Sequence, residues 1–392
     1  MRVLSLFDGM ACGALALMRA GITIDSYDAF EIDDYAVRTA LHNFPFIKQH
    51  GDVFKADFSE FKGIDLLCGG SPCTYWSIAQ KNNRETEASG MGWELFSQYV
   101  RALHEAKPKF FVYENNKSMS KAIRTSIDET FGFEAIGINS ALVSAQNRQR
   151  LYWVGKLNDD GTYSKVNIEQ PEDRGILLWN ILEGANEESV ACRCRGRVGK
   201  DGIPFAKYEC REDGKANTLD TNTTNGAMVA EPVCSDGCKG KILVAETVRV
   251  GALPRPNGEL STSQAFRVYS TEGKSVNLTA GGGGAGGKTG LYAIPCKLDE
   301  HGTVIKAVSC ADGKTYTVYE VKDGRITIKG KQYPIKLVDG CYIIRKLSVR
   351  ECMRLQTVPE WYEFPVSDSQ AYKMLGNGWT VELIAHILAS LK

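Results

Sequence analysis

The sequence predicts an α/β protein: a doubly wound, mostly parallel sheet followed by a second, smaller β-rich domain. Through residues 1–155, short apolar runs alternate with helical patterns, which is typical of a parallel sheet covered by helices on both faces. From about residue 162 to residue 345, helical periodicity fades, and short β-rich runs with many glycines, threonines and asparagines replace it. The 392 residues are enough for two or three cores, and we expect domains at 1–160, 161–344 and 345–392.

The elements of the first domain follow from its apolar runs and its glycines. We expect buried strands at residues 3–6, 23–29, 64–67 and 110–113, and a closing pair of strands at 136–139 and 151–154. Helices are expected at 14–20, where Gly21 ends the pattern, and at 35–43 and 95–106. This alternation is the one that a doubly wound sheet requires.

The last part of the chain returns to helical patterns. Ser348 and Glu351 have the spacing of a capping box, in which the hydroxyl and the carboxylate each accept a free amide at a helix start. A turn is expected at 376–378 and a final helix at 380–391. We expect this segment to pack back on the first domain.

Charge and hydropathy limit the classes of protein that fit. Lys and Arg together number 47, and so do Asp and Glu, so DNA binding would need cations gathered on one face. Neither a signal peptide nor an apolar stretch of membrane-spanning length is visible. The 12 cysteines are therefore expected to be mostly reduced thiols, and we expect a cytoplasmic protein with no membrane partner.

A glycine-rich turn follows the first expected strand. Residues 7–13 read Phe-Asp-Gly-Met-Ala-Cys-Gly, and such a turn lets a ligand approach the backbone closely. Glu31 ends the second strand, where an acid can bind ribose hydroxyls, and Asp52 ends the third segment, where it could bind an adenine amino group. Taken singly, each is as well explained by an ordinary turn or a solvated acid. Their order favours a nucleoside cofactor at the switch point of the sheet.

A cysteine lies in the loop after the strand expected at 64–67. Residues 69–73 read Gly-Gly-Ser-Pro-Cys, and a thiol at the carboxyl end of a strand is placed as an exposed nucleophile. The alternative is a buried structural thiol, which is our interpretation of Cys68 and Cys352.

Charged residues end the next two strands in the same region. Glu114 follows the strand at 110–113, beside the cysteine loop, and Gln146-x-Arg148-x-Arg150 precedes the strand at 151–154. Two arginines spaced by one share a face of an extended chain, which suits them to fix an acid and a polar group of a substrate. Each could instead be a surface charge, but together and in this order they favour an active site.

These motifs, together with Gly376-Asn377, resemble in their order those of the cytosine-5 DNA methyltransferases of bacterial and phage type. The resemblance covers about residues 1–155 and 345–392, and the segment between them fits a target recognition domain, to whose segments residues 267–282 are similar. The first turn resembles that of the animal de novo branch. Residues 74–77, and Asn116 after Glu114-Asn115, depart from the common bacterial forms without removing a catalytic group.

The resemblance implies a Rossmann-like S-adenosylmethionine-dependent methyltransferase that methylates carbon 5 of a flipped-out cytosine. It places catalysis at Cys73, Glu114, Arg148 and Arg150. Cys73 would add to carbon 6, Glu114 would hold the exocyclic amine and ring nitrogen 3, Arg150 would bind the carbonyl at position 2, and Arg148 would orient Glu114. It places cofactor binding at Phe7, Asp8, Gly9, Met10, Gly13, Glu31, Ile32, Asp52, Val53, Pro72, Asn377 and Trp379.

The resemblance also implies double-stranded DNA as partner and substrate. We expect DNA contacts at Ser77, Gln80, Lys81, Arg267 and Lys288, and residues 78–93 resemble the mobile loop that closes over a flipped base. One active site and one recognition domain favour a monomer, and a cognate restriction endonuclease accompanies some family members. The target sequence does not follow from these residues.

Four alternatives compete with this interpretation. A tRNA cytosine methyltransferase would use the same catalytic residues, but members of that branch have a smaller insertion before the tail. A catalytically silent DNA-binding regulator would not need Cys73, Glu114 and Arg150. Residues 282–289 match a phosphate-binding P-loop, yet a strand rather than a helix is expected after them. A zinc site at Cys192, Cys194, Cys210, Cys234 and Cys238 lacks paired Cys-x2-Cys spacing, so we expect no metal.

Overall fold

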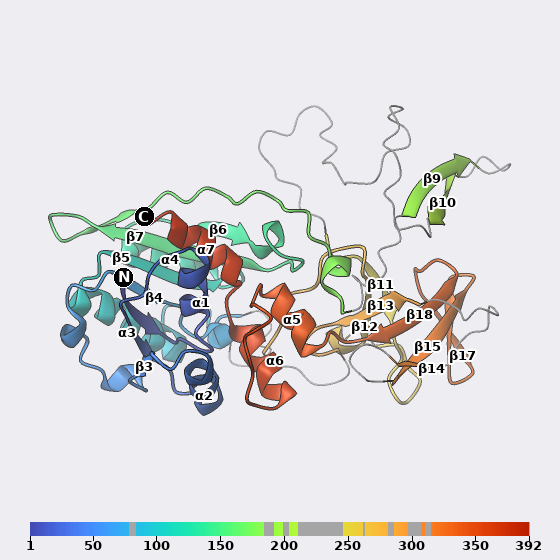
Figure 1. Ribbon diagram of the computed structural model, residues 1–392, viewed down its shortest axis with the longest axis horizontal. Coiled ribbons are helices and arrows are strands. Elements are labelled where there is room, and N and C mark those ends of the chain that lie inside the picture. The colour runs from blue at the N-terminus through green and yellow to red at the C-terminus, as the bar shows by residue number, and fades with distance from the viewer. Residues whose placement is uncertain are drawn as a thin grey trace.

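In the part of the chain that it describes, the computed structural model contains two eight-stranded sheets joined through a short helical segment (Figure 1). It describes residues 1–77, 84–183, 246–261, 263–280, 286–296 and 316–391, and the backbone of residues 192–198, 204–210, 307–309 and 315. In Figure 1 the helices α5 (Val349–Leu355) and α6 (Asp368–Asn377) lie between the sheets. None of the helices in these ranges is both long and apolar enough to cross a membrane.

The first sheet has the predicted doubly wound, mostly parallel form. Its order is β3 (Lys48–Gln49), β2 (Ser26–Phe30), β1 (Arg2–Leu6), β4 (Leu66–Gly69), β5 (Phe110–Asn116), β7 (Gln149–Leu157) and β6 (Ile136–Asn139), and β8 (Tyr163–Lys165) also pairs with β7. The first five strands are parallel, whereas β7 is antiparallel to β5, β6 and β8. From β1 the chain adds β2 and β3 on one side and then β4 and β5 on the other side, so the strand order reverses between β1 and β4. Ligands of such sheets bind at the carboxyl ends of the strands where the order reverses.

Helices cover both faces of this sheet. Alternate residues of β5 show the division: Val112 packs in the core that holds α1 (Cys12–Arg19), α2 (Asp34–Asn43) and α7 (Val381–Ala389), whereas Phe111 and Tyr113 pack in the core that holds α3 (Gly90–Ala106) and α4 (Lys121–Phe131). Because both faces are buried, the strands read as near-continuous apolar runs. Residues of α7 share this core with α1 and α2.

The capping box is confirmed, but the turn expected at 376–378 is wrong. The Ser348 hydroxyl accepts the amide of Glu351 at 3.1 Å, and the Glu351 carboxylate accepts the amide of Ser348 at 2.8 Å. Gly376 and Asn377 are instead the last residues of α6. A Cβ on Gly376 would lie 2.5 Å from the backbone nitrogen of Ala280, so this glycine permits close approach of two segments rather than a turn.

The second sheet is the predicted β-rich unit. Its order is β11 (Arg249–Ala252), β12 (Arg267–Ser270), β13 (Leu291–Pro295), β18 (Gly340–Arg345), β15 (Thr315–Lys322), β16 (Arg325–Ile328) and β17 (Lys331–Pro334), with β14 (Ala307–Ser309) paired to β15. A separate hairpin joins β9 (Cys192–Val198) and β10 (Pro204–Cys210). The sheet has its own apolar core, which includes Val268, Val321 and Ile326.

The proposed domain limits at 160 and 344 stay a prediction. Strand β8 extends the first sheet, and Ile168, Leu178 and Ile181 pack in the core of the first domain.

Candidate active site

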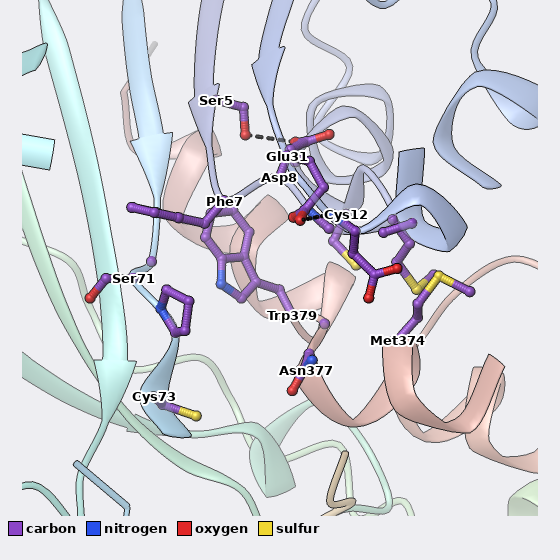
Figure 2. Close-up of a pocket in the computed structure, with 18 of the residues that line it drawn as sticks. Ser5, Phe7, Asp8, Cys12, Glu31, Ser71, Cys73, Met374, Asn377 and Trp379 are labelled. Atoms are coloured by element: carbon purple, nitrogen blue, oxygen red, sulfur yellow. Dashed lines mark hydrogen bonds between the residues drawn. The ribbon is translucent and has the colours of Figure 1, made fainter. Parts of the chain in front are cut away.

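A cavity of about 530 Å³ opens at the carboxyl ends of the central strands of the first sheet (Figure 2). All four predicted catalytic residues line it, and so does every predicted cofactor residue except Asp52 and Val53. In Figure 2, Asp8 and Glu31 lie at one end of the view and Cys73 at the other, with Trp379 between them. The motifs identified along the chain therefore meet at one place.

The first turn has a tightly constrained backbone. Phe7 and Ala11 have φ angles of 57° and 61°, in the left-handed region that side chains other than glycine rarely adopt, and Gly9 has a φ of 58°. Such strain costs about 1–3 kcal/mol per residue and is typical of ligand-binding loops. A Cβ on Gly13 would lie 2.6 Å from the hydroxyl of Tyr27, so this glycine lets α1 begin close against β2.

Glu31 is fixed by backbone amides at the end of β2. One carboxylate oxygen accepts the amide of Gly9 at 2.8 Å, and the other accepts the amides of Ile32 at 2.8 Å and Asp33 at 2.9 Å. The acid is thus held rigidly at the cavity wall. Beside it, Ile32 is 75% exposed and presents an apolar surface to the cavity.

Asp8 has an unusual buried carboxylate. Its Oδ1 accepts hydrogen bonds from the hydroxyls of Ser5 at 2.6 Å and Tyr27 at 2.7 Å, whereas its buried Oδ2 has no hydrogen-bond partner among the described residues. Burial raises the pKa of Asp8 to about 6, although the two hydroxyls act in the opposite direction.

This raised pKa predicts a pH dependence of stability. Because folded Asp8 holds its proton more tightly than the unfolded chain does, its contribution to stability is full below the ordinary pKa and is lost as the pH rises towards 6. Between pH 4 and pH 7, the free energy of unfolding of the wild type should fall relative to that of Asp8→Asn by about 1–3 kcal/mol. Denaturant unfolding of both proteins across this range measures the difference; a constant difference would contradict it.

Asp52 and Val53 lie outside the cavity. The Asp52 side chain accepts the amide of Phe54 at 3.0 Å and caps the short 3-10 helix at Val53–Lys55. Val53 is buried in the core on the α3 face of the sheet. Their contact with a cofactor stays a prediction.

The cysteine loop is held against β5. The hydroxyls of Ser71 and Tyr113 lie 2.6 Å apart, and the Asn115 amide donates to the backbone oxygen of Ser71 at 3.1 Å. A Cβ on Gly70 would lie 2.6 Å from the backbone oxygen of Glu114, so glycine allows the loop to approach this strand. Cys73 follows at the start of a short 3-10 helix, Cys73–Tyr75, half-buried in the cavity wall.

The other thiols near this region are buried. Burial raises the pKa of Cys68 and of Cys12 to about 12, and that of Cys352 well above its ordinary value. Cys68 and Cys352 are buried, as their interpretation as structural thiols requires. Cys73 is the only cysteine in the described ranges that is both in the cavity wall and partly exposed.

Glu114 is held by two donors from distant parts of the chain. Its Oε1 forms an ion pair with Nε of Arg150 at 2.9 Å, and its Oε2 accepts the indole N–H of Trp379 at 2.9 Å. Glu114 is only 8% exposed, so its charge is compensated inside the protein.

Arg148 does not have the hydrogen bonds that were expected. It was expected to orient Glu114, but its guanidinium donates to the side chain of Asn277 at 2.9 Å and to the carbonyls of Gly376 at 3.1 Å and Gly378 at 2.8 Å. Arg150 and Trp379 hold Glu114 instead. Burial, together with the nearby charge of Arg150, lowers the pKa of Arg148 to about 10, which leaves it a cation at neutral pH.

A segment of the second domain runs beside the arginine motif. Ser275 forms a parallel bridge with Gln146, its amide donates to the carbonyl of Ala145 at 2.7 Å, and its carbonyl accepts the amide of Asn147 at 3.0 Å. The fully buried ammonium of Lys274 donates to the carbonyls of Ala141 at 2.7 Å, Ser144 at 3.1 Å and Ile176 at 2.6 Å. Sequence reasoning missed this role because a lysine in a polar segment resembles a surface charge.

The residues expected to contact DNA lie at several places. Ser77 follows the short 3-10 helix Cys73–Tyr75, and Arg267 begins β12. The ammonium of Lys288 donates to the carbonyl of Ser369 at 3.0 Å. Gln80 and Lys81 lie outside the described residues. The strand expected after residues 282–289 is β13, so the phosphate-binding alternative lacks its helix. DNA contact by these residues stays a prediction.

The side chains of the five cysteines considered for zinc lie outside the part of the chain that the structure describes. Within the described part, no group of three or more His, Cys, Asp or Glu side chains could hold a metal ion.

Known proteins similar to this chain are methyltransferases. A family model described as C-5 cytosine-specific DNA methylase matches residues 1–392. The orphan methyltransferase M.SPRI of Bacillus phage SPR is 27% identical over 453 residues, covering 100% of this chain and 97% of that protein. The type II methyltransferase M.HhaI of Haemophilus parahaemolyticus is 24% identical, covering 99% and 93%.

Solved structures share the fold at low identity. S. pombe Dnmt2 methyltransferase has a TM-score of 0.54 at 14% identity, covering 100% of this chain and 98% of that chain. Entamoeba histolytica methyltransferase EhMeth has a TM-score of 0.55 at 12% identity, covering 100% and 97%.

Proposed function

Because the chain belongs to the C-5 cytosine-specific DNA methylase family, we propose that it transfers a methyl group from S-adenosylmethionine to carbon 5 of cytosine in double-stranded DNA. One observation carries this proposal: Cys73, Glu114 and Arg150 line the same cavity as the first turn and Glu31. A nucleophile and a fixed acid therefore face the space that a nucleoside cofactor and a base would share.

The cavity fits S-adenosylmethionine by size and by the chemistry of its wall. Its volume lies within the range of small-molecule sites. The rigid Glu31 carboxylate suits ribose hydroxyls, exposed Ile32 can cover an adenine ring, and the unpartnered Oδ2 of Asp8 suits a donor or a positive charge. Bound there, S-adenosylmethionine supplies a methyl group activated by the positive charge of its sulfonium.

The chain's own residues activate the base. The Cys73 thiolate adds to carbon 6 of cytosine, and the electron pair of the carbon 5–carbon 6 double bond moves onto carbon 5. Carbon 5 then takes the methyl group, whose bond to sulfur breaks with its electron pair left on sulfur. Glu114 accepts from the exocyclic amine and from ring nitrogen 3 in its protonated form, and Arg150 binds the carbonyl at position 2, so the protonated ring accepts the added electrons. Loss of the proton from carbon 5 to a base then restores the double bond and releases Cys73 as thiolate.

A base inside a duplex cannot reach this cavity. The carbon 6 face of a stacked cytosine is covered by its neighbours, so the target nucleotide must be flipped out of the helix. The second sheet is anchored to the arginine motif through Ser275 and to the segment before that motif through Lys274, so it is suited to hold the duplex beside the cavity. We propose that residues 161–344 form this recognition domain.

The competing functions differ in substrate or in turnover. A tRNA methyltransferase would use the same cavity, and the size of the insertion between the arginine motif and the tail favours DNA. A silent regulator would have no need for a half-buried Cys73 beside a doubly held Glu114. Bacterial and phage relatives favour the cytoplasm of such a cell, and one active site with one recognition domain favours a monomer.

Incubation with labelled S-adenosylmethionine and duplex DNA of mixed sequence tests the proposal. We expect label in DNA, and bisulfite sequencing should place 5-methylcytosine at one short recurring sequence. Label in tRNA alone would establish the RNA alternative, and transfer to neither would favour the silent regulator. If methylation is found, a restriction endonuclease that cuts the same sequence is the partner to seek in neighbouring genes.

Glu31→Ala should weaken cofactor binding selectively. Removal of a fixed carboxylate that accepts two ribose hydroxyls should raise the dissociation constant of S-adenosylmethionine about tenfold or more, because hydrogen bonds to charged groups contribute about 1.5–3 kcal/mol. Affinity for duplex DNA should change by less than about twofold. Calorimetry with the cofactor and a DNA titration give both constants. Glu129→Ala, at an exposed position of α4, is the control; equal losses of both affinities would overturn the assignment.

A further inference from the structure

Trp379 connects the end of the chain to the central acid of the cavity. Its indole N–H donates to Oε2 of Glu114 at 2.9 Å, across 265 positions of sequence. We propose that Trp379 is a positioning residue that fixes the Glu114 carboxylate for the base, in addition to lining the cofactor cavity. This inference rests on the proposed function.

The hydrogen bond from Trp379 complements the ion pair from Arg150 in fixing the Glu114 carboxylate. Arg150 donates to Oε1 and Trp379 to Oε2, so the two donors engage different oxygens and prevent rotation of the carboxylate. Each oxygen has two lone pairs, so each keeps one acceptor site, one for the exocyclic amine and one for the protonated ring nitrogen 3. A Cβ on Gly70 would lie 3.1 Å from Oε2, so the loop side of this oxygen is already closely packed. Without the indole N–H, only Arg150 would hold the carboxylate.

The backbone on both sides of Trp379 is fixed by buried groups. The carbonyl of Gly378 accepts from Arg148 at 2.8 Å and from the Gln356 amide at 3.2 Å. The hydroxyl of Thr380 is bonded to Ser140 and to Gln356, both at 2.9 Å. These contacts fix the backbone that carries the indole, and the bond to Oε2 orients its N–H toward Glu114.

The ring of Trp379 also lies among the cofactor residues. Figure 2 shows it between Phe7 and Asn377, on the path from the Glu31 end of the cavity to Cys73. A residue that only packed on the cofactor would affect the Michaelis constant for S-adenosylmethionine. A residue that also fixes Glu114 should affect the rate of the chemical step.

Trp379→Phe separates these two roles because it keeps an aromatic ring and removes the N–H. We expect kcat to fall about 10- to 100-fold, the usual effect of losing one charge-assisted hydrogen bond, with less than about a threefold rise in KM for S-adenosylmethionine. Trp361→Phe, at an exposed tryptophan outside the cavity, is the matched control and should keep wild-type constants. An unchanged kcat with a raised KM would overturn the proposal.

A double-mutant cycle tests whether the effect passes through Glu114. In the Glu114→Gln background, Trp379→Phe should lower the single-turnover methylation rate by less than about twofold, because the carboxylate it positions is gone. Full additivity would contradict the proposal. If the phenylalanine variant does not fold, 3-benzothienylalanine at position 379 keeps the bicyclic shape and replaces only the N–H by sulfur. A wild-type protein inactive on both DNA and RNA would instead refute the proposed function.

Discussion

Replacing Cys73 by serine should abolish methyl transfer while leaving the fold and the affinity for S-adenosylmethionine intact. An alcohol ionises far less readily than a thiol and is the weaker nucleophile, so addition to carbon 6 should fail. Loss of a covalent nucleophile lowers turnover by at least roughly a thousandfold. Because Cys73 is half-buried in the cavity wall and makes no core contact comparable to that of Cys68, the melting temperature should be unchanged.

A duplex with 5-fluorocytosine at the target position gives a direct measure of the covalent step. Fluorine cannot leave carbon 5 as a proton does, so the Cys73–carbon 6 bond should persist and a protein–DNA adduct should appear by mass. Cys73→Ser should form no adduct. Cys296→Ser, at a half-buried thiol next to β13 and outside the cavity, is the control and should behave as the wild type. Serine-variant turnover within tenfold of the wild type would exclude the covalent mechanism.

The fold was largely predictable because its signals are local. The strand at 110–113 is a run of apolar residues, and each of its side chains faces a covered side of the sheet, as the run requires. The capping box at Ser348 and Glu351 depends only on two residues three positions apart, and its two hydrogen bonds confirm the prediction. Gly376 was misjudged for the opposite reason: its packing partner, Ala280, lies almost a hundred positions earlier, and no local pattern reveals that contact.

The candidate site was predictable as a set of residues that line one cavity, whereas the hydrogen bonds between them were not predictable. The order of motifs identified Cys73, Glu114 and both arginines, and the cavity includes all four. It did not identify the partners: Asn277 lies in the second domain, Trp379 donates to Glu114, and Lys274 has three carbonyl acceptors. Hydrogen bonds between segments far apart in sequence depend on tertiary packing, which spacing along one chain does not encode.

Arg148→Met should be among the most destabilising single substitutions in the described part of the chain, by about 2–4 kcal/mol. Arg148 is 2% exposed and holds together Asn277 and the end of α6, through the carbonyls of Gly376 and Gly378. Methionine fills much of the space but donates no hydrogen bond. The side chain of Asn277 and the carbonyl of Gly376 would then lose their only donor among the described residues, and the carbonyl of Gly378 would keep only Gln356. Buried acceptors without a partner cost about 1–3 kcal/mol each.

The free energy of unfolding in urea measures this effect, and Arg124→Met is its control. Arg124 forms an ion pair with Asp128 at 3.6 Å on the partly exposed surface of α4, so the same change of side chain there should alter stability by less than about 0.5 kcal/mol. Because Arg148 joins the second domain to the backbone before Trp379, its loss should also release the indole that holds Glu114. Turnover of Arg148→Met should therefore fall even at temperatures where the protein stays folded; equal stability of the two methionine variants would contradict this account.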